Sequence, residues 1–324
     1  MIIRNHRNIW NSVLLVLCLK HTLCFLLSLS SQLIRLASWN LLAPVYTKGR
    51  KYPWCSEEHL SWDHRKGLIT EQLIRARADI LCLQEVQIEH WPDLLASLQP
   101  LQYQGILQNV TSGHPVATAV LYDTSKLELL RSESRSRALI AVLKERSSEE
   151  SSSSTNINMN TDRHLYLASV HLEAGQEEDC NLTRYHQLKS LWKRMSNHIR
   201  LDKVPLDDAA VVLAGDFNML YSNPLYSSLS RGLLYHPNNQ LTPAKKLTKL
   251  EDAYRATTSI APPKRLEKTF GGGSILDYIW TSERVDVKEC LVLNPQVLDP
   301  ERQLCPSDTH PSDHFPIGAV FQWR

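Results

Sequence analysis

The apolar run that ends at Asp216 constrains the fold of this chain most strongly. Residues 209–219 read Ala-Ala-Val-Val-Leu-Ala-Gly-Asp-Phe-Asn-Met. Six small or branched apolar residues in a row are typical of a strand buried on both faces, which cannot hold a carboxylate midway without great cost. Gly215 lets the backbone turn and a ligand approach, and Asp216 and Asn218 project to one side. An ordinary strand followed by an Asx turn is the alternative interpretation.

Three other predicted strands end in polar side chains in the same way. They span residues 33–40, 79–86 and 165–172, and they place Asn40, Glu85 and His171 at or near their ends. A surface carboxylate and a structural histidine are the ordinary alternatives for Glu85 and His171. The four apolar residues at 80–83, just ahead of Gln84 and Glu85, favour a buried strand end instead.

Two acidic residues near the C-terminus are predicted to lie beside a histidine. Asp277 lies inside the apolar strand 275–280, where an unpaired charge would be costly, so it needs a buried partner. Asp313 and His314, directly ahead of the apolar run 317–321, supply that partner. An aspartate bonded to a histidine holds its tautomer and stabilises its charged form, as suits an imidazolium beside a phosphate.

The remaining pattern predicts mixed helices and strands, and hence the α/β class. Helices are expected from Trp62 onward with Ser61 as cap, at 91–98, around 185–199, at 225–234 and at 247–255, and strands at 103–110, 116–122 and 138–144. The glycines at 271–273 are expected to form a tight turn, because no Lys-Ser or Lys-Thr follows them as in a phosphate-binding loop.

We predict one folded domain over residues 32–324, preceded by a separate N-terminal segment and interrupted by one insertion loop. Residues 147–163 are almost entirely polar and predict a disordered insertion loop. Residues 1–31 carry basic but no acidic side chains around two apolar blocks, which predicts a signal peptide or signal anchor and a secretory or membrane-associated location. An organellar transit peptide is the alternative, and membrane contact is expected only through this segment.

Charge and donor chemistry narrow the function. With 36 basic and 34 acidic side chains the chain has no polyelectrolyte signature, so charge alone does not predict binding to long duplex nucleic acid. The seven cysteines show no zinc-type spacing. Carboxylate, amide and imidazole groups at strand ends favour Mg²⁺ or Mn²⁺ and the hydrolysis of phosphate esters by an activated water.

Six motifs in order resemble those of the endonuclease/exonuclease/phosphatase superfamily. They are Trp39-Asn40, Leu83-Gln84-Glu85, His171-Leu172, Gly215-Asp216-Phe217-Asn218, Leu276-Asp277-Tyr278 and Ser312-Asp313-His314. The segments Asn40-Leu41-Leu42-Ala43, Trp62-Asp63-His64-Arg65-Lys66 and Pro311-Ser312-Asp313-His314 are most similar to the nocturnin, Angel and carbon-catabolite-repressor deadenylase branch.

This resemblance implies a four-layer sandwich of two mixed β-sheets flanked by helices, with the site at one edge. It also implies a role for each motif residue. Glu85 would bind the principal metal with Asn40 and Asp313 nearby. Asp216 would activate or orient the attacking water with the help of Asn218, and these two could also help to hold a second metal. His171 and His314 would contact the phosphoryl oxygens, with Asp277 supporting His314.

The motifs leave the substrate open. Phe270 matches an aromatic residue that stacks on adenine in the branch, but the proline that usually faces it has no equivalent here. Glu173 stands where relatives commonly have a basic residue, which weakens the case for a long polyanion. No leucine-rich repeats accompany the domain, so docking into a larger complex through such repeats is not expected.

The leading hypothesis is a Mg²⁺-dependent phosphodiesterase that acts as a 3′-exoribonuclease on an RNA 3′ end. A phosphatase or diesterase on a small nucleotide or terminal phosphate is the alternative, and a sphingomyelinase-like lipid activity is a third. An inactive binding module with the same fold is disfavoured, because every acid, amide and histidine that the chemistry needs is present.

Overall fold

The computed structural model describes residues 32–49, 51–110, 113–146, 163–236, 239–255, 266–299, 301 and 303–323. The predicted leader at residues 1–31 lies outside these residues. The predicted insertion at 147–163 also lies outside them, except for Arg163.

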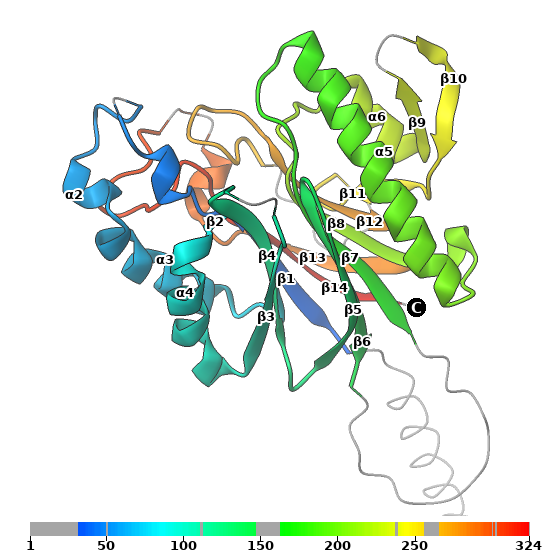
Figure 1. The fold of residues 1–324 in the computed structure, drawn as a ribbon, viewed down its shortest axis with the longest axis horizontal. Coiled ribbons are helices and arrows are strands. Elements are labelled where there is room, and N and C mark those ends of the chain that lie inside the picture. Colours follow the sequence, from blue (N-terminus) through cyan, green and yellow to red (C-terminus); the bar gives the residue numbers. More distant parts are fainter. Residues whose placement is uncertain are drawn as a thin grey trace, which may run out of the picture. The chain divides into compact units, whose positions relative to one another are not determined.

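The described strands form two six-stranded sheets and one separate strand pair (Figure 1). The first sheet has the order β13 (Val285–Leu291), β14 (Ile317–Trp323), β1 (Ile34–Asn40), β2 (Ile80–Gln87), β4 (Val116–Asp123) and β3 (Tyr103–Leu107). The second has the order β11 (Leu250–Asp252), β12 (Asp277–Ser282), β8 (Ala210–Asp216), β7 (His164–His171), β6 (Ala138–Glu145) and β5 (Leu127–Arg135). The pair consists of β9 (Leu233–His236) and β10 (Asn239–Lys246).

Helices cover the outer face of each sheet (Figure 1). α3 (Trp62–Ala76) and α4 (Trp91–Leu98) pack on the first sheet, and α5 (Glu178–Leu201) and α6 (Pro224–Arg231) pack on the second. The shorter elements are α2 (Glu57–Leu60), η1 (Pro44–Tyr46), η2 (Ile88–His90), η3 (Gln99–Leu101), η4 (Leu206–Asp208) and η5 (Pro295–Leu298). Within the described part of the chain, no helix combines the length and apolar character needed to span a bilayer.

A buried apolar core between the two sheets completes the sandwich. Ile34 and Ile80 of the first sheet belong to one cluster with Leu165 and Val212 of the second. Every residue of β8 is buried, as expected for a strand with apolar neighbours on both faces. The predicted four-layer α/β sandwich of two mixed sheets is therefore confirmed.

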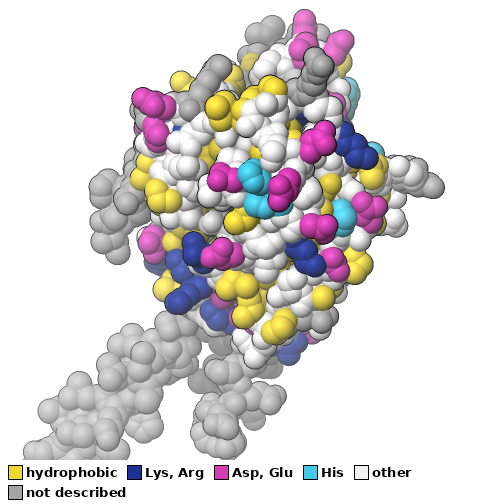
Figure 2. Space-filling model, turned by 90° about the vertical axis from the view of Figure 1, so that its left-hand side faces the viewer, with side chains coloured by type: hydrophobic (Ala, Val, Ile, Leu, Met, Phe, Trp, Pro, Cys, Tyr) yellow, Lys and Arg dark blue, Asp and Glu magenta, His cyan; other side chains and the backbone are white. Residues whose placement is uncertain are grey.

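Figure 2 shows the side of the domain that carries α2 and α3. Acidic and histidine side chains gather near the centre of this view, and basic side chains are mixed with acidic ones around them. Among the described residues visible there, no continuous basic band crosses the face. This face therefore offers no broad electrostatic track for a long polyanion.

The register of the second sheet lines up three of the predicted site residues. β7 runs parallel to β8 and pairs His171 with Asp216, while β12 runs antiparallel and pairs Asp277 with Asp216. Gly215 has φ 148°, and a Cβ there would lie 1.9 Å from the Val170 oxygen. Only glycine therefore fits at this position. The sequence predicts that Gly215 lets a ligand come close, but in the structure it is the backbone of β7 that comes close.

The first sheet brings its site residues to the same edge. β1 and β2 are parallel and pair Asn40 with Gln84, the residue before Glu85. β14 is antiparallel to β1, so the segment ahead of it, with Asp313 and His314, arrives where β1 ends. In each case the polar group lies at the end of a strand, at the rim of the apolar core. It is therefore not buried in the middle of a strand, where it would be costly.

Two predicted helices differ from the structure. α6 ends at Arg231 because Gly232 adopts a left-handed conformation with φ 68°, and the chain continues into β9 instead of extending the helix to residue 234. The helix predicted at 247–255 is wrong, since residues 250–252 form β11 at the edge of the second sheet. Apolar runs this short fit either pattern, and pairing with β12 decides between them.

Arg65 ties together the loops that carry the site. It is fully buried on α3, and its guanidinium donates to the carbonyl oxygens of Leu41 at 3.1 Å, Leu42 at 2.7 Å and Pro311 at 2.7 Å. Its Nε donates to the Leu60 carbonyl at 3.2 Å. Burial lowers the pKa of Arg65 to about 10, so it is still charged at neutral pH.

We expect Arg65→Met to lower the free energy of unfolding by at least about 3 kcal/mol, because four buried carbonyl groups lose a charged donor. Chemical denaturation measures this loss. Arg75→Met is the matched control on the same helix, since the Arg75 side chain is 71% exposed, and it should change stability by no more than about 0.5 kcal/mol. Equal effects of the two substitutions would contradict the assignment.

Candidate active site

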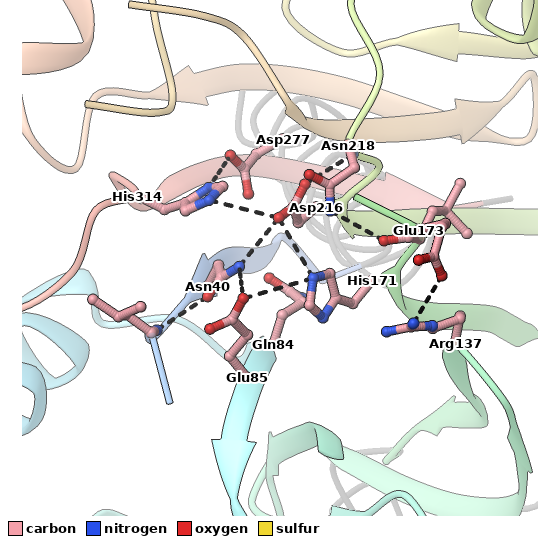
Figure 3. Close-up of polar contacts among 12 residues, drawn as sticks. Asn40, Gln84, Glu85, Arg137, His171, Glu173, Asp216, Asn218, Asp277 and His314 are labelled. Carbon is pink, nitrogen blue, oxygen red and sulfur yellow. Dashed lines mark hydrogen bonds and ion pairs between the residues drawn. The ribbon is translucent and has the colours of Figure 1, made fainter. Parts of the chain in front are cut away.

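Asn40 lies at the centre of the site between two carboxylates (Figure 3). Its Nδ2 donates to Glu85 Oε1 and to Asp216 Oδ2, both at 3.1 Å. Its Oδ1 accepts from the Leu42 backbone N–H at 3.0 Å, so the amide presents its NH₂ group to the acids. Asn40 thus links the ends of β1, β2 and β8, and its role as a metal ligand stays a prediction.

Glu85 is directed into the site by a bulge in β2. The pairing of β2 with β4 shifts register between Leu83 and Val86, and Glu85 itself has φ 54°. A left-handed backbone costs a non-glycine residue on the order of 1–3 kcal/mol and is found most often at functional sites. The Ala43 backbone N–H donates to Glu85 Oε2 at 3.1 Å and holds the carboxylate in place.

Asp216 uses its two carboxylate oxygens for different tasks. Oδ1 accepts from the Asn218 backbone N–H at 2.9 Å, which is an Asx turn, while Oδ2 faces Asn40. Asn218 has φ 50°, and its Nδ2 donates to the Leu172 carbonyl at 3.0 Å. The turn therefore fixes the carboxylate while leaving one oxygen directed at the site.

Two histidines face Asp216. His314 Nδ1 lies 2.9 Å from Asp277 Oδ2, so Asp277 has the buried partner that the sequence requires, and His314 Nε2 lies 3.6 Å from Asp216 Oδ2. His171 Nε2 lies 3.7 Å from Glu85 Oε1 and 3.8 Å from Asp216 Oδ2. The three longer distances exceed those of hydrogen bonds.

Asp313 enters the site from the segment ahead of β14. The Tyr52 hydroxyl donates to Asp313 Oδ2 at 2.7 Å. Ser312 Oγ donates to the Asn40 carbonyl at 2.7 Å and accepts from the His314 backbone N–H at 3.1 Å. These bonds anchor the Asp313–His314 segment to the end of β1 and to the Tyr52 loop.

Burial disfavours the charged forms of Glu85 and Asp216. It raises the pKa of Glu85, and the negative charge of Asp313 adds to that effect. It also raises the pKa of Asp216 to about 6, where His314 opposes the rise and Asp277 adds to it. In both groups burial is the largest cause, because a carboxylate removed from water loses the solvation of its charged form.

The same environment shifts the pKa values of the two histidines in opposite directions. Burial disfavours the charged form of His314, but Asp277 and Asp216 overcome it and raise the pKa of His314 well above its ordinary value. Burial lowers the pKa of His171, with Asp216 opposing. At neutral pH the site therefore holds one imidazolium, His314, and one neutral imidazole, His171.

The donor set fits a hard divalent cation. Glu85, Asp216 and Asp313 offer carboxylate oxygens, the ligands that Mg²⁺ and Mn²⁺ prefer. A bound cation would also favour the ionised forms of Glu85 and Asp216, whose pKa values burial raises. Among the described residues near the site, Gln84 Oε1 and Asp277 Oδ1 are buried without a hydrogen-bond partner, and such oxygens need further partners.

A second group could in principle hold a cation. Asp216, Asp277 and His314 offer ligand atoms that lie within 4.8 Å of one another. A protonated imidazole has no lone pair to donate, however, and the pKa of His314 is raised well above its ordinary value. We interpret this group as an imidazolium between two carboxylates, and the metal site at Glu85 and Asp313 stays a prediction.

Phe270 lies beside His314 at the edge of the site. The two ring centroids are 5.1 Å apart at an interplanar angle of 49°, and the two backbones pair in an isolated bridge. The predicted tight turn forms next to it, with the Gly273 N–H donating to the Phe270 carbonyl at 2.9 Å. A Cβ on Gly272 would lie 2.5 Å from the Phe270 ring. Stacking of a base on this ring stays a prediction.

Four residues that support the site have no role assigned from the sequence. They are Tyr52, Arg65, Gln84 and Ser312. Gln84 joins the two sheets, because its Nε2 donates to Ser169 Oγ at 3.1 Å. Arg65, Gln84 and Ser312 lie inside the motifs quoted above, so their place in a motif could have indicated a supporting role. Tyr52 lies in a loop outside the motifs, and no sequence pattern indicates its role.

The comparison with protein families covers the whole site. The Endonuclease/Exonuclease/phosphatase family matches residues 37–314. This interval contains every predicted site residue, from Asn40 to His314.

Individual relatives agree with that match. Nocturnin of Drosophila melanogaster is 26% identical over 89% of this chain and 46% of its own length, so the chain spans less than half of that relative. Carbon catabolite repressor protein 4 homolog 4 of Arabidopsis thaliana is 28% identical over 90% of this chain and 78% of its own. The structure of ANGEL2, a 2′,3′-cyclic phosphatase, in complex with adenosine-2′,3′-vanadate superposes with a TM-score of 0.71 at 21% identity, covering 91% of this chain and 97% of that one. These neighbours belong to the branch that the motifs resemble.

Replacing Asp277 with asparagine is expected to lower the pKa of His314, because the imidazolium loses its hydrogen-bonded counter-ion. If hydrolysis needs protonated His314, the alkaline limb of the rate–pH profile moves to lower pH. Activity at neutral pH should also fall, by roughly 10- to 100-fold for a residue that positions a catalytic group. The pH dependence of phosphate ester hydrolysis measures both effects.

Asp252→Asn is the control for this prediction. Asp252 is another buried aspartate of the second sheet, and its carboxylate accepts from the Tyr226 hydroxyl at 2.9 Å, away from His314. Its variant should keep the position of the alkaline limb. An unchanged limb in Asp277→Asn would refute the coupling.

Proposed function

Because the chain belongs to the Endonuclease/Exonuclease/phosphatase family, whose members act on phosphate esters, we propose that it is a metal-dependent phosphodiesterase with 3′-exoribonuclease activity. The observation that carries the proposal is the convergence of acids and imidazoles on Asp216. His171 and His314 contact its carboxylate directly. Glu85 is linked to it through Asn40, and Asp277 through His314, although these residues are far apart in sequence.

Asp216 accepts the proton of the attacking water in this proposal. A general base works best when its pKa lies near the working pH, and the pKa of Asp216 is raised to about 6. The Asx turn to Asn218 fixes its Oδ1, so Oδ2 is the oxygen available to the water. Above pH 6 this carboxylate is mainly ionised and able to accept.

His314 and His171 donate hydrogen bonds to the phosphoryl oxygens as negative charge develops there. His314 does so as an imidazolium held by Asp277, and His171 as a neutral imidazole. Donors that are already fixed before the reaction stabilise such charge without reorganisation. Loss of either should lower the rate more than substrate binding.

Glu85, with Asp313 and Asn40 beside it, would hold Mg²⁺ or Mn²⁺. When bound, the ion would supply Lewis-acid stabilisation of the negative charge on the phosphoryl group. The side chain of Asn40 contributes by holding Glu85 and Asp216 in one orientation through its NH₂ group. Tyr52 does the same for Asp313.

An RNA 3′ end is the proposed substrate because an aromatic ring lies next to the reacting groups. Phe270 is only partly buried, and its ring lies against His314. Stacking of a base on an aromatic ring contributes roughly 1 to 3 kcal/mol and tolerates different bases. The terminal base would then be placed beside the histidine that contacts its phosphate.

A phosphatase or diesterase acting on a small nucleotide is the second candidate. ANGEL2, which shares the fold, is a 2′,3′-cyclic phosphatase and was captured with adenosine-2′,3′-vanadate. The ion pair between Arg137 and Glu173, at 2.8 Å, also leaves little uncompensated positive charge near His171 for a long polyanion. A short substrate fits that charge balance.

Hydrolysis of 5′-labelled oligoadenylate by the protein with Mg²⁺ tests the proposal directly. We expect a ladder of shortened products, abolished by EDTA and reduced at least about 100-fold in Glu85→Gln. A mixed-sequence RNA of equal length tests base preference. Release of phosphate from mononucleotides without a ladder would move the assignment to the second candidate.

The cation itself can be tested by stability. Binding of Mg²⁺ or Mn²⁺ to the native state should raise the melting temperature. At an ion concentration of 100 times Kd, the free energy of unfolding should rise by about 2.7 kcal/mol. Glu85→Gln should lose this increase. Glu89→Gln serves as the control, since Glu89 is exposed in η2 and bonds to Gln87. The same increase in wild type and Glu85→Gln would argue against the Glu85 site.

A further inference from the structure

A polar groove of about 500 Å³ begins at His171 and has no assigned role. Its walls come from the region between β3 and β4 and from the hairpin that joins β5 to β6. Polar side chains dominate it, including Tyr46, Asn109, His114, Arg135 and Arg137. Among the described residues that line it there is no aspartate or glutamate. A groove of this character, opening from a phosphate-ester site, suits an anionic part of the substrate.

Arg137 is fixed at the inner end of this groove. Its carbonyl accepts from the His171 backbone N–H at 2.9 Å, and the next residue, Ala138, pairs with Val170. The backbone of Arg137 therefore cannot move independently of the site. Its side chain is one-third exposed, so the guanidinium can contact a ligand without leaving a buried position.

In the structure, Arg137 forms an ion pair with Glu173. Arg137 Nη2 lies 2.8 Å from Glu173 Oε2, and both side chains are 33% exposed (Figure 3). Ion pairs this exposed contribute little to stability, typically about 0–1 kcal/mol. A phosphate can accept two parallel hydrogen bonds from the guanidinium, whereas Glu173 accepts one, at Oε2, so a phosphate can compete with it for Arg137.

We propose that Arg137 binds a second phosphate group of the substrate in this groove, and that Glu173 competes with that phosphate for the guanidinium. The proposal rests on the proposed function, because the scissile phosphate must first lie at His171. The second phosphate is the neighbouring phosphodiester of an RNA chain or the additional phosphate of a small nucleotide. Arg137 then sets specificity: it favours substrates with two phosphates over those with one.

Arg135 provides an internal control two residues away. It lies on the same hairpin and also lines the groove, but its Nη2 donates to Ser190 Oγ of α5 at 2.9 Å. Its head group is therefore committed to the helix side of the sheet. Arg135→Gln removes one positive charge from the same region without removing the proposed phosphate ligand.

Two pairs of substrates separate the second phosphate from the rest of the molecule. ApApA has one phosphodiester beyond the scissile one and ApA has none, while adenosine 3′,5′-bisphosphate and adenosine 3′-monophosphate form the small-nucleotide pair. We expect wild-type protein to prefer the two-phosphate member in kcat/KM by about 10- to 100-fold, the value of a charged hydrogen-bonded contact. Preference in the first pair points to RNA, and preference in the second points to a small nucleotide.

Arg137→Gln should abolish this preference through KM while leaving kcat/KM for the one-phosphate member within about threefold of wild type. Arg137→Lys should restore part of it, because lysine keeps the charge but not the two-pronged geometry. Glu173→Gln should raise the preference, since the competitor is removed. Arg135→Gln should leave it unchanged. A preference that survives Arg137→Gln, or a wild type without any, would overturn the proposal.

Binding measured apart from turnover separates this proposal from the proposed function. Calorimetric titration of the same ligands in Ca²⁺, which takes similar oxygen ligands, reports affinity whether or not hydrolysis occurs. Tighter binding of the two-phosphate ligands that is lost in Arg137→Gln would support the groove even if no substrate were cleaved. Equal affinity of both ligands for wild type, with cleavage observed, would refute the groove alone. If Arg137→Gln fails to fold, the increase expected from Glu173→Gln decides.

Discussion

The amide of Asn40 is the interaction on which the site depends. Glu85 and Asp216 belong to different sheets, and burial raises the pKa of both because it disfavours their charged forms. One NH₂ group donates to both carboxylates, while the Leu42 N–H fixes the orientation of the amide. The two sheets can therefore close over an apolar core and still leave two acids facing each other at its edge. The amide holds the acids apart without neutralising them, and a cation or a water can use that remaining charge.

Three of the six described non-glycine residues with positive φ lie around the same point. Leu42, Glu85 and Asn218 have φ values of 57°, 54° and 50°, and each of them contacts Asn40 or Asp216. Conformations of this kind cost on the order of 1–3 kcal/mol each, so they persist only where the surroundings enforce them. Here the enforcing contacts are the bulge in β2, the Asx turn after β8 and the loop carbonyls held by Arg65. A packed core thus stabilises a site whose own geometry is unfavourable.

The sequence reveals the fold and most of the site because both follow from where apolar runs stop. β8 is buried throughout and Asp216 comes at its end, and the same rule places Asn40, Glu85 and His171. The Asx turn that seemed to compete with a functional interpretation is present and helps to orient Asp216. Contacts between distant segments have no local pattern. Nothing in the loop around Tyr52 predicts its bond to Asp313, and strand β5, whose hairpin carries Arg137, was not predicted at all.

The different protonation of the two histidines follows from geometry and not from residue type. His314 has Asp277 at hydrogen-bond distance and Asp216 at 3.6 Å, whereas the nearest carboxylate oxygens to His171 are 3.7 and 3.8 Å away. Burial disfavours the charged form of both, and at His314 the charges of Asp277 and Asp216, together with the hydrogen bond to Asp277, reverse that effect. The site therefore contains, at neutral pH, an ionised Asp216 that can accept a proton and a charged His314 that can donate one. His314 stays protonated and Asp216 stays ionised although they lie 3.6 Å apart, because the Asp277 carboxylate is hydrogen-bonded to His314 and not to the Asp216 side chain.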